Sequence, residues 1–175
     1  MIIVLYAFLG LLAVVLLIAL AVKKEYSISA EIVIDRPSDA VFNYIIHLRN
    51  QEKYSKWVMA DPNAKLVYKG VDGTKGFIAS WASEDKNVGV GEQEIKKIIP
   101  GEGYEVEIRF EKPFKGISQA QTMAKAISSN QTRVKTNFDT KTPFPMSIMI
   151  PMIKKMLLKD MNQNMVNLKR ILESQ

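Results

Sequence analysis

The sequence predicts an α+β fold in which an antiparallel sheet packs one face against a long C-terminal helix. One strand-like segment is followed by two short helical ones, then by six strands between residues 64 and 140, then by one long amphipathic helix. The joints between the six strands are short, which favours antiparallel neighbours because parallel strands need a long crossover. A sheet with one apolar face must cover it with another element, and the final helix is long enough to do so.

The first predicted strand covers residues 26–35. Its apolar residues recur at every second position and therefore share one face; they are Ile28, Ala30, Ile32 and Ile34. Pro37 suits the first turn of the short helix that follows. The apolar stripe of that helix consists of Val41, Phe42, Ile45 and Ile46. A second short helix is predicted around residues 48–57.

The six later strands are predicted over residues 64–69, 76–84, 88–99, 103–111, 116–127 and 131–140. Alternation is clearest in the fourth of these, where even-numbered residues are apolar and odd-numbered ones are charged. This pattern indicates one dry and one wet face. The final helix is predicted over residues 146–173, because apolar residues recur there at spacings of three and four, with Pro151 in its first turn.

The N-terminal residues 1–22, which begin with Met1 and end with Val22, contain no charged side chain. A helix of this length covers roughly 30 Å, the thickness of a bilayer's hydrocarbon core, which predicts a transmembrane anchor and a single-pass membrane protein. Lys23 and Lys24 follow it and, by the positive-inside rule, predict a cytoplasmic domain. A cleaved signal peptide and a buried core helix are the alternatives. The predicted division is an anchor over residues 1–22, a linker over 23–27 and one domain over 28–175.

The composition excludes several kinds of site. Cysteine is absent, so the chain has no disulfide, no thiolate metal site and no cysteine nucleophile. The net charge is +6, from 24 Lys and Arg against 18 Asp and Glu. These basic residues are dispersed among acidic ones, which argues against nucleic-acid binding. Two interpretations of the basic residues remain: a solvated basic surface, or contact with an anionic membrane surface through Lys23, Lys24, Lys154 and Lys155.

No pattern predicts a catalytic residue, a metal site or a cofactor. His47 is the only histidine and has no nucleophile–base pattern beside it. The metal-ligand spacings of zinc and calcium motifs are absent. Gly89 and Gly91 lack the third glycine of a dinucleotide-binding loop and are more typical of a bend in a strand.

Several short strings occur in an order that resembles the SRPBCC superfamily of START and Bet v 1-like helix-grip proteins, within it the polyketide cyclase/dehydrase branch. These strings are Ile32 to Pro37, Tyr54 to Trp57 followed by Asp61-Pro62, Gly89 to Glu92, and Lys112 to Phe114. The resemblance spans about residues 28–173. It implies a curved sheet of seven strands that wraps the C-terminal helix, with a ligand cavity between them. It implies little about activity, because one fold hosts many functions.

Such a cavity would be lined by the dry face of the strands and by the helix stripe. The predicted lining residues are Phe77, Ala79, Trp81, Tyr104, Val106, Ile108, Phe110, Met123, Phe138, Met149, Ile150, Ile153 and Leu157. The alternative is that these side chains simply fill the core. The predicted function is the binding of a lipid-like or other apolar small molecule by burial. A cyclase- or hydrolase-type enzyme using a Glu or Tyr in the same cavity, and a non-catalytic interaction module, are the other hypotheses.

Overall fold

The computed structural model describes residues 4, 6, 9, 10, 24–86, 88–143 and 145–175. Within these ranges no helix is both long enough and apolar enough to cross a membrane. This finding contradicts the predicted localisation as a single-pass membrane protein with a cytoplasmic domain. The predicted anchor, residues 1–22, lies largely outside the described residues.

The elements follow the predicted order. Strand β1 (Glu25–Ile34) is followed by helix α2 (Ser38–Ile45), the 3₁₀ turn η1 (Leu48–Asn50), helix α3 (Gln51–Tyr54) and the 3₁₀ turn η2 (Val58–Ala60). The later strands are β2 (Lys65–Lys69), β3 (Ile78–Ala82), β4 (Val90–Ile99), β5 (Gly103–Lys112), β6 (Gly116–Ser128) and β7 (Gln131–Lys141). The turn η3 (Met146–Met149) leads into helix α4 (Ile150–Glu173), where Pro151 occupies the first turn as predicted.

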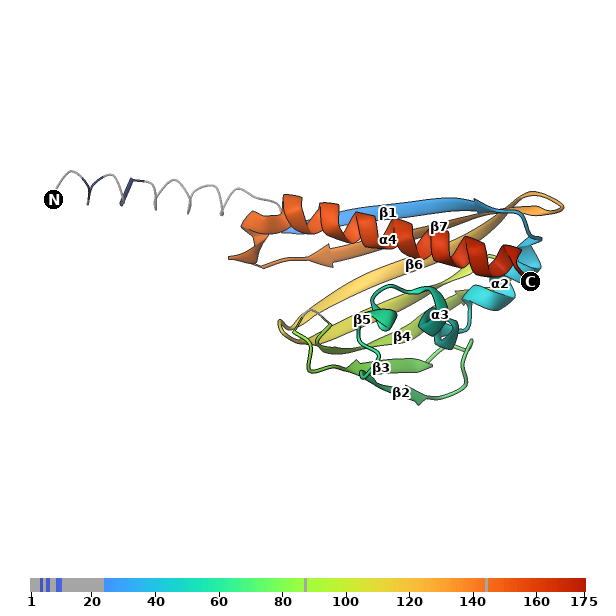
Figure 1. Ribbon diagram of the computed structural model, residues 1–175, viewed down its shortest axis with the longest axis horizontal. Helices are drawn as coiled ribbons and strands as arrows, with labels where there is room; N and C mark the ends of the chain where they lie inside the picture. The colour runs from blue at the N-terminus through green and yellow to red at the C-terminus, as the bar shows by residue number, and fades with distance from the viewer. Residues whose placement is uncertain (1–3, 5, 7–8, 11–23, 87, 144) are drawn as a thin grey trace.

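The strands form one seven-stranded sheet in the order β1-β7-β6-β5-β4-β3-β2, and every neighbouring pair is antiparallel. Helix α4 runs along β1, while α3 and its flanking turns lie over the β3–β5 side of the sheet (Figure 1). We call the face turned toward α4 and α3 the inner face. The predicted α+β helix-grip arrangement, an antiparallel sheet with a long C-terminal helix, is confirmed.

Two boundaries differ from the sequence-based expectation. Strand β1 begins at Glu25, inside the predicted linker 23–27, because its first residues pair with the end of β7. The single helix expected over residues 48–57 is instead η1 followed directly by α3, which ends at Tyr54, and the next turn, η2, begins only at Val58. The break lies at Ser55, whose backbone is extended with ψ of 115°.

Side chains of α4 hold this broken segment in place. Asn164 accepts a hydrogen bond from the backbone N–H of Lys56 at 2.7 Å, and Asn167 donates one to the carbonyl of Tyr54 at 3.1 Å. Backbone groups that a longer helix would have satisfied internally therefore find partners on α4. As a result, the α3 segment is fixed between the sheet and the long helix.

One end of the interior is a close-packed core. It lies where α2, the C-terminal half of α4, the end of β1 and the start of β7 meet. No side chain in the following set is more than 2% exposed: Ile34, Val41, Ile45, Ile95, Val134, Leu168 and Leu172.

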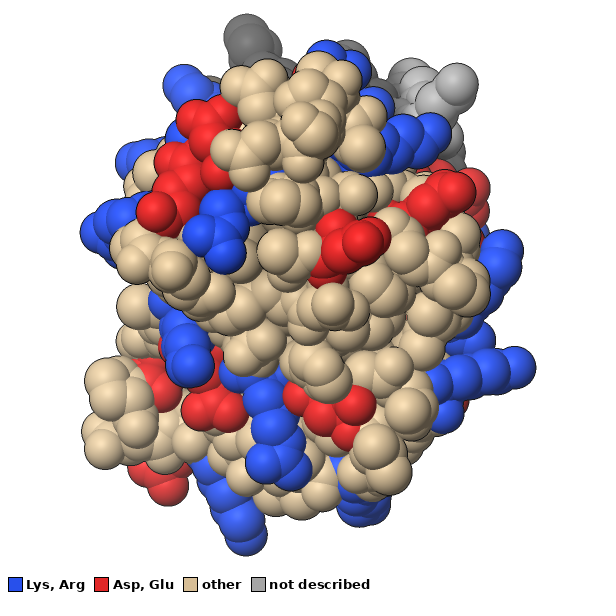
Figure 2. All heavy atoms as spheres, turned by 90° about the vertical axis from the view of Figure 1, so that its right-hand side faces the viewer, with Lys and Arg blue, Asp and Glu red and all other residues tan. Residues whose placement is uncertain are grey.

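Outside this core, the end of the molecule at the right of Figure 1 shows acidic and basic side chains interspersed among neutral ones (Figure 2). That face is a mixed solvated surface without a continuous basic stripe.

The outer face of the sheet carries an ion-pair cluster centred on Arg109 of β5. Its guanidinium group contacts Glu92 at 2.8 Å, Glu94 at 2.9 Å and Glu107 at 2.6 Å. The hydrogen bond from Arg109 is the main reason why the pKa of Glu94 and that of Glu107 lie below the ordinary value.

These lowered pKa values predict an acid-dependent loss of stability. A carboxyl whose pKa is lower in the folded state stabilises the fold above its unfolded pKa, about 4.3 for Glu, and loses that effect as pH falls through the folded value. We expect the free energy of unfolding to fall between roughly pH 5 and pH 3, and less steeply in an Arg109→Gln variant. Urea unfolding at several pH values measures how steeply the free energy of unfolding falls with pH in the unmodified protein and in Arg109→Gln. Arg133→Gln, at an exposed position of β7, is the control, and an equal slope in all three proteins would contradict the expectation.

Candidate ligand-binding site

Burial of the inner face changes from one end of the molecule to the other. Along β5, Tyr104 and Val106 are each 3% exposed, whereas the next two inner-face residues, Ile108 and Phe110, are only partly buried. Helix α4 shows the same gradient, since its C-terminal half is buried but Ile153 and Leu157 in the other half are not. We call the well-buried end the packed half and the other end the open half.

The two ends of α4 fix the direction of this gradient. Lys169, near the helix C-terminus, donates a hydrogen bond to the carbonyl of Val33 at the end of β1. Lys154, near the N-terminus, lies 5.8 Å from the ring centre of Tyr26 at the start of β1. The partly exposed residues of α4 therefore lie at the same end of the sheet as Ile108 and Phe110. The apolar groups at this end of the interior are therefore less completely buried than those of the packed half.

The structure divides the predicted lining residues among four environments. Phe77, Ala79, Tyr104, Val106, Phe138 and Ile150 are buried; Trp81, Ile108, Phe110, Ile153 and Leu157 are partly exposed; Met149 is 45% exposed; and Met123 lies on the outer face. Met123 is placed there because its neighbours Thr122 and Ala124 are the buried inner-face residues of β6, and side chains alternate along a strand. It packs over Gly103 of the neighbouring strand β5 and does not line the interior.

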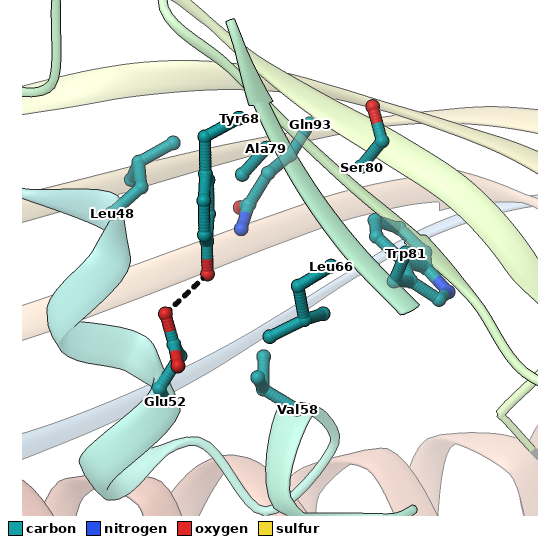
Figure 3. A pocket seen from close by; sticks show the side chains of 9 residues that line it. All are labelled: Leu48, Glu52, Val58, Leu66, Tyr68, Ala79, Ser80, Trp81 and Gln93. Atoms are coloured by element: carbon teal, nitrogen blue, oxygen red, sulfur yellow. Dashed lines mark hydrogen bonds between the residues drawn. The ribbon is translucent and has the colours of Figure 1, made fainter. Parts of the chain in front are cut away.

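A small pocket lies beneath α3, on the β2–β4 side of the inner face. Its volume is about 20 Å³, and roughly 10–15 Å³ is enough for one water molecule. The residues that line it are Leu48, Glu52, Val58, Leu66, Tyr68, Ala79, Ser80, Trp81 and Gln93 (Figure 3). Figure 3 shows the side chains of Tyr68 and Glu52 pointing toward one another across it, while Ser80 points away. We call this space the α3 pocket.

A wider hollow of about 370 Å³ lies over the ends of β1, β6 and β7. Its lining consists of Glu25, Tyr26, Ser27, Ile117, Ser118, Gln119, Asp139, Thr140 and Lys141. Tyr26, Ser118 and Thr140 have inner-face positions in the strand register, whereas the other lining residues alternate with them onto the outer face. The hollow is therefore mainly a feature of the outer face of the sheet and not part of the interior.

A chain of hydrogen bonds crosses the middle of the inner face. The Gln93 side chain donates to that of Gln51 at 2.7 Å, and the hydroxyl of Tyr104 is hydrogen-bonded with Gln51, Tyr54 and Thr122. Burial raises the pKa of Tyr54 and that of Tyr104, so both remain neutral phenols at physiological pH. These groups can donate and accept hydrogen bonds but are not prepared to act as bases.

Reasoning from the sequence did not single out Glu52, Tyr68 or Gln93 as residues of one site. Glu52 belongs to a short helical piece without a usable period, and the three residues come from α3, β2 and β4. Gln93 did carry a signal, because its position in β4 has the same parity as Gly91 and Ile95 on the inner face. A polar residue at an inner-face position is a candidate for orienting a ligand. In the described part of the chain, no three His, Asp or Glu side chains are arranged to hold a metal ion.

No family model and no curated protein matches the chain, but solved structures do. Ara h 8.0201 is 14% identical with a TM-score of 0.57 over 86% of this chain and 99% of its own. Truncated norcoclaurine synthase from Thalictrum flavum is 15% identical with a TM-score of 0.63 over 85% and 94%. A protein from Chromobacterium violaceum is 12% identical with a TM-score of 0.60 over 84% and 96%.

At these identities the likeness establishes the fold alone. The chain has the helix-grip fold of Bet v 1-like proteins, as the SRPBCC resemblance in the sequence implied. Its particular biochemical role has to be argued from the side chains of the inner face.

Proposed function

We propose that the protein binds an apolar small molecule in the open half of its interior. The observation that carries this proposal is the burial gradient of the inner face, where the apolar side chains of Ile108 and Phe110 on the sheet and of Leu157 on α4 stay in partial contact with water. An apolar ligand in this space would remove that surface from water, at about 25 cal/mol for each Å².

The packed half gives the site a rigid base. Its side chains are fully buried and fix the C-terminal half of α4 against β1, so the open half has one immobile boundary. Preorganised walls favour binding because less conformational freedom is lost when the ligand enters. Fold and burial together therefore support a carrier or receptor of apolar molecules. A reaction of the polyketide cyclase kind would need a base in this interior; the neutral Tyr54 and Tyr104 do not provide one, so this alternative would rest on the carboxylate of Glu52 at the α3 pocket.

Native mass spectrometry of the full chain purified from cells tests this proposal. We expect a co-purifying small molecule to appear as a discrete mass increment that is lost on organic extraction. A second readout is tryptophan fluorescence, because Trp81 lies at the α3 pocket and the chain has only two tryptophans. In a Trp57→Phe variant the signal comes from Trp81 alone. An empty protein whose Trp81 emission does not respond to dodecanol, dodecylamine or dodecanoic acid would contradict the proposal.

A further inference from the structure

Residues that line the α3 pocket are direct neighbours of residues in the open half of the interior. Trp81 lines the pocket and packs edge-on against Phe110, with ring centres 6.0 Å apart. Gln93 also lines the pocket and lies directly opposite Ile108 in the strand register. A ligand whose apolar part contacts Ile108 and Phe110 can therefore place one end in the α3 pocket.

The polar groups that face this pocket are mainly hydrogen-bond acceptors. The hydroxyl of Tyr68 donates to one carboxylate oxygen of Glu52, which leaves the second oxygen of that carboxylate available (Figure 3). One amide N–H of Gln93 donates to Gln51, and its carbonyl oxygen is a further acceptor beside the second N–H. A ligand hydroxyl or ammonium group can supply the donor that such acceptors pair with.

The charge around the pocket favours the same partner. Glu52 is the ionisable carboxyl among the lining residues, and the aromatic ring of Trp81 can attract a cation to its face. The ring of Tyr68 already stacks on Phe77. Arg49 is near, with its guanidinium carbon 4.5 Å from the ring centre of Tyr68, but it is not among the residues that line the pocket. A ligand carboxylate would therefore meet another carboxylate inside the pocket, and such like-charge contacts reject a ligand.

The size of the pocket limits the group further. A volume of about 20 Å³ holds one water-sized group and little more. A hydroxyl or an ammonium group has that size, whereas a carboxylate brings two oxygens and a carbon. The size, the acceptors and the charge of the pocket thus all favour a hydroxyl or ammonium group over a carboxylate.

We propose that the α3 pocket binds the hydroxyl or ammonium end of an apolar ligand whose chain lies in the open half. This inference rests on the proposed function and narrows its ligand class to apolar alcohols and amines, against fatty acids. The residues responsible are Glu52 and Gln93 as acceptors, with Tyr68 holding the Glu52 carboxylate in position.

The test compares three probes with the same twelve-carbon chain, namely dodecylamine, dodecanol and dodecanoic acid, each below its micelle concentration. Binding to the full chain is followed by Trp81 emission in the Trp57→Phe background. We expect dodecylamine to bind at least about tenfold more tightly than dodecanoic acid, the effect of one charge-assisted hydrogen bond. Glu52→Gln should reduce this preference about tenfold, while the affinity for dodecanol changes less than that for the amine.

Glu31→Gln is the matched control, because Glu31 is an exposed carboxyl on β1, far along the sheet from β2–β4. It should leave all three affinities unchanged. If the three probes bind equally well, or if the acid binds best, the head-group inference fails while the proposed function stands. If none binds, the proposed function itself fails. A preference for the amine that Glu52→Gln leaves intact would likewise overturn the role of Glu52.

Discussion

Replacing Phe77 by alanine is expected to lower the free energy of unfolding by about 3–5 kcal/mol, as for other fully buried aromatic side chains. Phe77 is 0% exposed and stacks on Tyr68 with ring centres 6.0 Å apart. Its backbone carbonyl also accepts a hydrogen bond from the N–H of Ile95 at 3.0 Å. The truncation would remove the ring from the core between β2 and β4 and leave a cavity that these paired strands cannot close.

Chemical denaturation followed by circular dichroism measures this loss. Phe114→Ala is the matched control, because it deletes the same side chain at a position that is 60% exposed. It should change the free energy of unfolding by no more than about 0.5 kcal/mol. Similar losses in the two variants would show that Phe77 is not part of the packed core.

The second large effect concerns ligand binding. Ala120→Trp should weaken the binding of dodecanol about tenfold or more, because the indole occupies space that the ligand needs. Ala120 is a partly buried inner-face residue of β6, opposite Val106 on one side and Phe138 on the other. It stands at the boundary between the packed half and the open half.

The same variant distinguishes an open interior from a filled one. In a filled core the larger side chain would cost about 1–3 kcal/mol in overpacking. In an open interior it enters unoccupied space, so we expect stability to change by less than about 1 kcal/mol. Gln119→Trp, which places the indole at an exposed position of the outer face, is the control for both measurements. A strongly destabilised Ala120→Trp variant with unchanged binding would contradict the open half.

Much of the fold could be predicted because alternation is a local property of the chain. The strand expected over residues 103–111 is β5 (Gly103–Lys112), with its even-numbered side chains on the inner face as predicted. The long helix, with Pro151 in its first turn, could be predicted in the same way. One apolar stripe at spacings of three and four is typical of a helix that packs one face on a sheet.

The candidate site was less predictable, for two physical reasons. The difference between Val106, which is buried, and Ile108, which is not, depends on which elements cover each position in the folded chain, and no local pattern encodes that. The placement of Met123 was predictable in principle. Met123 and Ala120 are three positions apart in one strand, and an odd separation places two side chains on opposite faces.

The pairing of β1 with β7 has a consequence for synthesis. The side chains of Ser27 and Asp139 are hydrogen-bonded across this pair although 112 positions separate them in the sequence. At translation rates of about 5–20 residues per second, β1 waits on the order of 5–20 s for its partner strand to be made. During that time the alternating apolar residues of β1 have no sheet to join, and the nascent chain depends on chaperones or on slow, long-range closure. Helix α4 follows β7 in the chain, so it can pack on β1 only after it too has left the ribosome.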